Sequence, residues 1–238
     1  MRVTLRSGFV ALGALAAVAC APGPGAHHAP GDTGAVGALR LVPREGVTPG
    51  TPGGGAYGDR RLRDVEFVDY AHPGFAVVYL EGGRSPGGQI DLSIRETRTR
   101  VVLSPEHAVV GVGGTIVVRN EAREPHVVSC PAAQLVRRIA PGERVEIPAS
   151  DAGERSIFLL DAKTAEALVF VAPGPFAVTA DDGTFALHGL PVGAQRLRAW
   201  HPRFPPATRS IELVSGELLH VDIELGVDLP EEPPSASR

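Results

Sequence analysis

Residues 155–171 read R-S-I-F-L-L-D-A-K-T-A-E-A-L-V-F-V, and this stretch decides how the chain folds. Two apolar runs flank a short polar segment, which is the pattern of a strand, a loop and a second strand. The polar segment holds Asp161, Lys163, Thr164 and Glu166. We expect these four side chains to lie in the loop, where they form a candidate contact surface. None of them is Cys, His or Met, so the loop carries no soft metal ligand.

The rest of the chain consists mainly of further short apolar runs with turns between them. Residues 75–80 are apolar almost throughout, which predicts a buried strand, and residues 89–94 alternate strictly, as a half-buried strand does. Asp182-Gly183 lies between two such runs and predicts a hairpin. No window of helical length shows a sustained apolar pattern at i, i+3, i+4 and i+7. The sequence therefore predicts an all-β fold made of Greek-key β-sandwiches.

Length and composition bound the classes of protein to which the chain can belong. Its 238 residues allow one large or two small domains, and a hydrophobic fraction of 43% is that of a globular protein. The net charge of -4 is spread along the chain without a basic block, so nucleic acid is not an expected partner. Motifs for a nucleophile, a zinc protease and a phosphate loop are missing from the sequence, as are paired carboxylates, and we predict that the protein is not an enzyme.

Residues 1–20 have the pattern of a bacterial secretory signal. A short basic start precedes an apolar run at 8–18, which is shorter than the roughly 20 residues that a membrane-spanning helix needs. The segment ends in A-V-A-C at 17–20, which resembles a lipobox and implies that Cys20 is lipidated as the first residue of the mature protein. The alternative is cleavage without lipidation. Both predict an extracytoplasmic protein, and the lipidated form is anchored to a membrane, in the periplasm or at the cell surface.

A first family resemblance lies in the C-terminal part of the chain. Residues 176–202 contain a D-x-G-x-F hairpin, then G-L-P-x-G, then a strand that ends at W-H. This segment resembles the carboxypeptidase-regulatory-like, or transthyretin-like, module, and F-A-V-V-Y-L-E-G at 75–82 resembles the early strand of the same module. The resemblance implies a β-sandwich without catalytic residues of its own.

A second resemblance covers the part of the chain between those two segments. A G-x-x-V strand at 114–117 is followed by Asn120, by a strand that starts at His126, by P-G-E at 141–143 and by the hairpin already quoted. This layout is similar to that of a cupredoxin-like domain of the plastocyanin-related type. Such a domain would be inserted between the two halves of the first module.

The two resemblances, together with composition, imply six segments along the chain. Residues 21–63 are mostly Gly, Pro and Ala and cannot bury enough apolar surface to order themselves, except for one candidate edge strand at 38–42. We expect a signal peptide at 1–20, a disordered tether at 21–63, the first half of the regulatory-like sandwich at 64–98, the cupredoxin-like insertion at 99–173, the second half of the sandwich at 174–227 and a disordered tail at 228–238.

The cupredoxin resemblance implies a type 1 copper site, and the sequence does not supply its ligands. Such a site takes a Cys thiolate and two imidazoles, with a Met as long axial ligand. The resemblance places His126 at the first imidazole. It places the thiolate, second imidazole and axial positions near Phe158, Asp161 and Thr164 respectively, and none of these is a copper ligand of the required type. We therefore expect the fold without the copper, and no cofactor.

Two further groups of residues leave alternatives open. In a strand at 126–130, His126 and Cys130 share one face, and with His107 they form a candidate soft site for Cu(I) or Zn. The alternative is a strand histidine near the surface and a buried cysteine. Trp200-His201-Pro202 is either a patch on which a ligand stacks or a core tryptophan at the end of a strand.

These observations predict a non-enzymatic lipoprotein of the cell envelope with a binding or structural role. Its expected partners are the membrane, through the lipid, and an envelope protein or polymer. A first alternative is a copper-handling or periplasmic electron-transfer protein that uses His126 and Cys130. A second is an accessory subunit of a periplasmic enzyme complex, in which the former copper loop is a docking surface.

Overall fold

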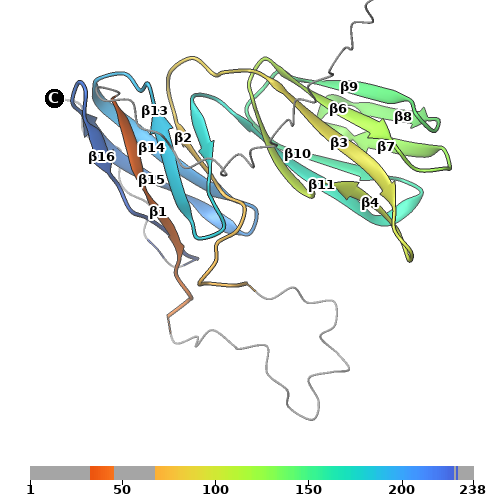
Figure 1. Ribbon diagram of the computed structural model, residues 1–238, viewed down its shortest axis with the longest axis horizontal. Coiled ribbons are helices and arrows are strands. Elements are labelled where there is room, and N and C mark those ends of the chain that lie inside the picture. Colours follow the sequence, from red (N-terminus) through yellow and green to blue (C-terminus); the bar gives the residue numbers. More distant parts are fainter. Residues whose placement is uncertain (1–32, 46–67, 228, 230–238) are drawn as a thin grey trace, which may run out of the picture.

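The computed structural model describes residues 33–45, 68–227 and 229, and within these ranges the protein is almost entirely β-structure. Seventeen strands and one short 3-10 helix, η1 (Pro131–Ala133), account for the secondary structure of the described residues. The predicted all-β sandwich fold is therefore confirmed. Figure 1 shows two sandwiches side by side, which we call the inserted and the flanking sandwich. The described residues include no helix long and apolar enough to cross a membrane.

The inserted sandwich is built from nine strands that are consecutive in the chain. They are β3 (Gln89–Glu96), β4 (Val101–Ser104), β5 (His107–Gly111), β6 (Gly114–Asn120), β7 (His126–Cys130), β8 (Leu135–Ile139), β9 (Arg144–Ala149), β10 (Gly153–Leu159) and β11 (Ala162–Ala172). One sheet has the order β4-β3-β6-β9 and the other β5-β11-β10-β7-β8. The pairs β3–β6 and β5–β11 are parallel, so the chain crosses between the sheets instead of meandering through one.

The core of the inserted sandwich follows from alternation along its strands. In β9 every second residue is buried, and Val145, Ile147 and Ala149 point inward between exposed neighbours. The same period places Leu92 and Ile94 of β3 in the core. A strand with one apolar face buries that face against the facing sheet, and this burial is the main stabilising term of the sandwich.

The flanking sandwich is assembled from strands that lie before and after the inserted one. They are β1 (Gly34–Leu41), β2 (Val77–Leu80), β12 (Phe176–Val178), β13 (Thr184–His188), β14 (Gly193–His201), β15 (Phe204–Leu213), β16 (Leu218–His220) and β17 (Ile223–Leu225). One sheet has the order β13-β1-β16, with β17 also paired to β1, and the other has the order β12-β2-β14-β15.

Strand β1 differs from the expectation for this part of the chain, which was a disordered tether with an edge strand at 38–42. It is an eight-residue strand in the middle of its sheet, and it pairs with β13, β16 and β17. Ala35, Leu39 and Leu41 are buried in the core, with Gly37 in the same alternating series. Glycine interrupts the apolar pattern because the neighbouring chain is too close for a side chain, and a Cβ on Gly37 would clash with the carbonyl oxygen of Val221.

Two other expectations also differ from the structure. Strands β12 and β13 flank the tight turn at Asp182-Gly183 but do not pair with each other, because β12 joins β2 and β13 joins β1. Strand β3 packs in the core of the inserted sandwich, so the boundary between the sandwiches falls between β2 and β3 and not at residue 98. Residues 68–70, the first described residues of the segment 64–98, are not in a strand. The signal peptide with Cys20, most of the tether and the tail at 230–238 lie outside the described residues.

A third apolar cluster joins the two sandwiches. Val77 and Tyr79 of β2 and Trp200 of β14 pack against Phe170 and Ala172 of β11. The rings of Phe170 and Trp200 stack with their centroids 4.6 Å apart. Strand β2 is therefore buried on both faces, which explains why its sequence is apolar throughout. Of the two readings of Trp200, the structure supports the core tryptophan.

Candidate functional site

The end of the inserted sandwich at which the resemblance places the ligand positions of a copper site is closed by a hydrogen bond between side chains. His126 begins β7, and Asp161 lies in the two-residue turn between β10 and β11. The Nδ1 of His126 donates to Oδ2 of Asp161 over 3.1 Å, and Oδ1 of Asp161 accepts the backbone N–H of Val127 over 3.2 Å. The structure thus brings together the two positions that the resemblance assigned to the imidazoles.

Only one of the two ring nitrogens of His126, Nδ1, has a hydrogen-bond partner among the described residues. Its side chain is 8% exposed, and its Nε2 is buried without a hydrogen-bond partner among the described residues. A proton on Nε2 would have no acceptor there, whereas a proton on Nδ1 has the carboxylate. The surroundings therefore favour a proton on Nδ1, where the carboxylate of Asp161 accepts it.

The residues at this end do not fit a type 1 copper ion. The Nδ1 of His126 is already engaged by the carboxylate of Asp161, and Phe158 offers no donor atom. A type 1 copper ion needs a thiolate and two imidazoles in one plane. Here a carboxylate stands in place of one imidazole and a phenyl ring in place of the thiolate, so that plane cannot form. Within residues 33–45, 68–227 and 229, no group of three Cys, His, Asp or Glu side chains is arranged to hold a metal.

The alternative site of His126, Cys130 and His107 is not assembled either. His126 and Cys130 are both buried on the inward side of β7, as alternation predicts, but they stand four residues apart in an extended strand. That spacing separates their Cα atoms by about 13 Å, too far for both side chains to ligate one ion. His107 lies on β5, separated from β7 by β11 and β10, and its ring stacks on Phe75 at 5.6 Å.

The predicted contact loop is shorter than expected. Only Leu160 and Asp161 form the turn, and Lys163, Thr164 and Glu166 belong to β11. Ala165 and Ala167 alternate with exposed Glu166 and face the core. Glu166 therefore lies on the outer face of a half-buried strand, and the small size of the alanines hides this alternation in the sequence. The structure brings Asp161 to His126 and leaves Glu166 one strand further along the sheet, opposite Phe158.

A group of exposed and half-buried apolar residues lies beside the His126–Asp161 contact. Val136 of β8, Ser129 of β7 and Phe158 of β10 are in register across three strands and share the outer face of their sheet. Val127 lies on the same face, and the N–H of Leu160 bonds to its carbonyl oxygen. Val136 is 66% exposed and Leu160 54% exposed. We call Val127, Val136, Phe158 and Leu160 the apolar strip.

The fold and this site define an all-β protein of two sandwiches, with the side chains of His126 and Asp161 joined at one end of the inserted sandwich. Comparison with solved structures finds cupredoxins. A purple cupredoxin from Nitrosopumilus maritimus is 19% identical at a TM-score of 0.31, over 34% of this chain and 98% of that one. Amicyanin from Paracoccus versutus is 13% identical at a TM-score of 0.30, over 40% of this chain and 96% of that one. No protein-family model matches the sequence, and no curated protein matches it.

Proposed function

We propose that the protein is a non-enzymatic binding protein of the cell envelope, anchored to a membrane by a lipid on Cys20. The observation that carries the binding role is the apolar strip. Val136 and Leu160 are exposed, Val127 and Phe158 are half-buried close to them, and neighbouring apolar residues at a surface mark contact surfaces more often than isolated ones do. The envelope location rests on the signal pattern at 1–20.

The position of the apolar strip supports a protein as its partner. The outer face of this sheet already packs against another part of the same chain. Phe170 of β11 and Val109 of β5, at the opposite edge of the sheet, pack against the flanking sandwich. The strip continues this face over β10, β7 and β8. Arg138, opposite Val127, and neighbouring Arg137 are exposed at the edge strand. A partner with an apolar contact residue and flanking carboxylates would match both features.

The proposal that the protein binds no copper rests on the side chains at the end of the inserted sandwich where His126 and Asp161 meet. The carboxylate of Asp161 satisfies the Nδ1 of His126 and ties the turn to β7 without an ion. Metal analysis of the purified full chain tests this. We expect no stoichiometric copper. One copper per chain with an intense blue absorption would overturn the proposal and favour electron transfer.

Co-purification tests the binding role. The full-length protein is extracted from membranes without crosslinker, in parallel with Val136→Asp, Leu160→Asp and the matched control Val214→Asp. Val214 is 53% exposed and lies after β15 in the flanking sandwich. We expect a protein partner to accompany the wild type and the control and to be lost from both strip variants. Identical partners in all four samples, or retention on envelope polymer alone, would contradict a protein-binding strip.

A further inference from the structure

Strand β8 leaves one edge of its sheet without a partner. It is the last strand in the order β5-β11-β10-β7-β8, and Figure 1 shows it beside β7 at the end of the inserted sandwich. Its three central residues, Val136, Arg137 and Arg138, are exposed. An unpaired edge offers backbone N–H and C=O groups to an added strand, and many proteins bind extended peptides in this way.

The backbone groups that point away from the sheet belong to Val136 and Arg138. The carbonyl oxygen of Val127 accepts an N–H from the turn that follows β10, so the backbone of Val127 faces β10 and that of Val128 faces β8. Val128 is opposite Arg137, so the backbone groups of Arg137 face β7. Because successive residues of a strand alternate, the N–H and C=O groups of Val136 and Arg138 point to the free edge. No strand of the described residues pairs with that edge.

Other long edges of the two sandwiches are less open to an added strand. Pro148 lies in edge strand β9, and Pro205 and Pro206 lie in edge strand β15. A proline has no N–H to donate, and it is one of the devices that block strand addition. Strand β5, at the other end of the same sheet as β8, packs through His107 against Phe75 of the flanking part of the chain. Strand β8 has neither a proline nor such a cover over its exposed central residues.

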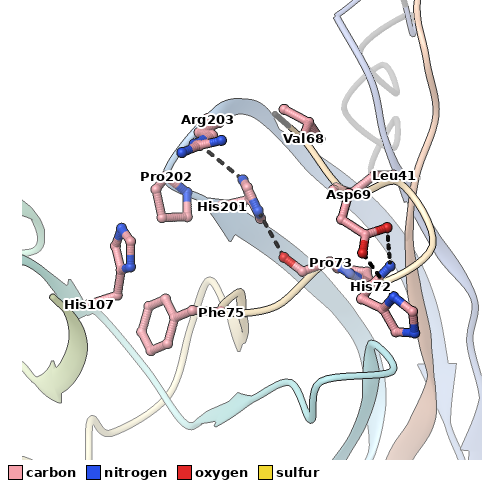
Figure 2. Close-up of a pocket in the computed structure, with 10 residues that line it drawn as sticks. All are labelled: Leu41, Val68, Asp69, His72, Pro73, Phe75, His107, His201, Pro202 and Arg203. Carbon is pink, nitrogen blue, oxygen red and sulfur yellow. Dashed lines mark hydrogen bonds and ion pairs between the residues drawn. The ribbon is translucent and has the colours of Figure 1, made fainter. Parts of the chain in front are cut away.

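A second candidate, the cavity where the two sandwiches meet, lacks such free groups. It has a volume of about 200 Å³, and Figure 2 shows the side chains that line it. His201 donates from Nε2 to the carbonyl oxygen of Pro73 over 3.2 Å and accepts the backbone N–H of Arg203 at Nδ1 over 3.0 Å. Asp69 accepts Nδ1 of His72 over 2.9 Å. These groups are engaged within the chain, whereas the outward groups of β8 are not.

The two arginines of β8 determine which kind of strand fits. Neither guanidinium has a hydrogen-bond or ion-pair partner among the described residues, and both side chains are exposed. Arg138 shares the outer face with Val136, whereas Arg137 alternates with it and belongs to the inward series of buried Ile139. An added strand therefore meets a positive charge on each of its faces. A carboxylate opposite each arginine would stabilise the pairing.

A second copy of β8 does not suit this edge. The antiparallel register that pairs all five residues of two such strands places the Arg137 side chains of the two copies opposite each other. The outward groups of Val136 would bond to those of Arg138, so Arg137 would occupy the non-hydrogen-bonded position, at which side chains are closest. Like charges directly opposite each other destabilise a pair of strands. The edge thus repels a second copy and attracts an acidic strand.

We propose that β8 pairs with an extended acidic segment of the partner protein, which joins the sheet as an antiparallel strand. The segment places an apolar residue opposite Val136 and a carboxylate opposite each of Arg137 and Arg138. Its apolar side chain extends the row of Val136, Ser129 and Phe158 by one strand, so that the added strand and the apolar strip form one contact surface. This inference rests on the proposed binding function, and it adds how the partner binds and which residues the partner supplies.

Two synthetic peptides test the pairing with the full chain. In acetyl-S-T-V-E-E-V-V-T-S-amide, antiparallel pairing places the two glutamates opposite Arg138 and Arg137 and the next valine opposite Val136. The control peptide, acetyl-S-T-V-K-K-V-V-T-S-amide, carries two lysines instead. Calorimetric titration measures binding, and hydrogen exchange followed by NMR shows which amides become paired. We expect saturable binding of one acidic peptide per chain, binding of the lysine peptide weaker by about tenfold or more, and slower exchange at Val136 and Arg138.

Variants of the protein separate strand pairing from contact with the sheet face. Val136→Pro keeps an apolar side chain and removes an N–H that points to the free edge, and we expect it to weaken binding of the acidic peptide by about tenfold or more. The double variant Arg137→Glu with Arg138→Glu should reverse the preference between the two peptides. Arg100→Glu, at an exposed position between β3 and β4, is the control and should bind the acidic peptide as the wild type does.

No saturable binding of the acidic peptide, equal affinity for both peptides, or unchanged hydrogen exchange at Val136 and Arg138 would overturn the proposal. If Val136→Pro lowers the melting temperature, the exchange measurement on the wild type decides instead. Co-purification separates this inference from the proposed function. A native partner that is lost from Val136→Asp but retained by a folded Val136→Pro would uphold the binding function and overturn the added strand. Binding of the acidic peptide without any co-purifying partner would support the pairing and contradict the proposed function.

Discussion

The indole N–H of Trp200 donates to Oε1 of Glu154 over 2.7 Å, and this bond ties strand β14 of the flanking sandwich to β10 of the inserted one. It stands next to the stack of Trp200 on Phe170. A directional bond beside a stacked pair fixes both the distance and the relative orientation of the two sandwiches. These contacts, together with the third apolar cluster, hold the two sandwiches against each other.

Trp200→Phe is expected to lower the free energy of unfolding by about 1–3 kcal/mol, because it removes the hydrogen bond and part of the stacked area while keeping an aromatic ring. Glu154→Gln keeps an acceptor for the indole, and we expect a smaller loss. Urea unfolding followed by circular dichroism measures both changes. Equal losses in the two variants would show that the bond contributes through the charge of Glu154 and not through its acceptor.

Asp161→Ala is expected to destabilise the inserted sandwich by about 1–3 kcal/mol, because it leaves Nδ1 of His126 and the N–H of Val127 without their acceptor. Asp161→Asn retains a carbonyl oxygen and should lose less. Asp151→Ala, at an exposed position in the bend before β10, serves as the control and should change stability by no more than about 0.5 kcal/mol. A loss for Asp161→Ala no larger than that of the control would contradict the closing role of Asp161.

Gly37→Ala is expected to disrupt the flanking sandwich, because the new methyl group would clash with the carbonyl oxygen of Val221. Overpacking of this kind costs about 1–3 kcal/mol or more. Gly82→Ala is the matched control, since a Cβ there meets nothing within 4 Å. Thermal unfolding compares them, and an unchanged midpoint for Gly37→Ala would mean that β1 does not pass this close to Val221.

The pKa of His201 is lowered by burial from an ordinary value of 6.5, so stability should depend on pH through this residue. The unfolded chain takes up a proton at His201 at a higher pH than the folded chain does. The contribution of His201 to stability is therefore full above about pH 6.5 and is lost as the pH falls toward the folded pKa. We expect His201→Gln to reduce the loss of stability between pH 7 and pH 5.5, whereas His220→Gln, at an exposed position on β16, retains it. Parallel slopes for wild type and His201→Gln would refute this.

Much of the fold is predictable from the sequence because its strands alternate. The strand His126–Cys130 has the expected bounds, and the strand Gln89–Glu96 contains the alternating residues 89–94. Strand β1 is not predictable in this way, since glycines replace the side chains that would show its period. The pairing of β13 with β1 cannot be predicted from the turn before β13 either. A turn sequence specifies that the chain reverses, and it does not specify which strand the next one pairs with.

The candidate sites differ in how well the sequence predicts them. The positions of His126 and Asp161 follow from the resemblance, but their hydrogen bond does not, because it depends on how the turn after β10 folds back onto β7. The cavity has no local signal at all. Its walls come from Leu41, from the segment before β2, from His107 and from the turn after β14, and only the tertiary structure brings these together.

The pairing of β1 with β13, β16 and β17 has a consequence for the order in which the protein folds during synthesis. The inserted sandwich is complete once β11 has emerged, because all its strands are consecutive in the chain. Strand β1 emerges much earlier, and its partners are synthesised last, at residues 184–225. At that point all strands of the inserted sandwich are available, whereas β1 still lacks its partners. That strand stays open to other partners until the end of the chain arrives.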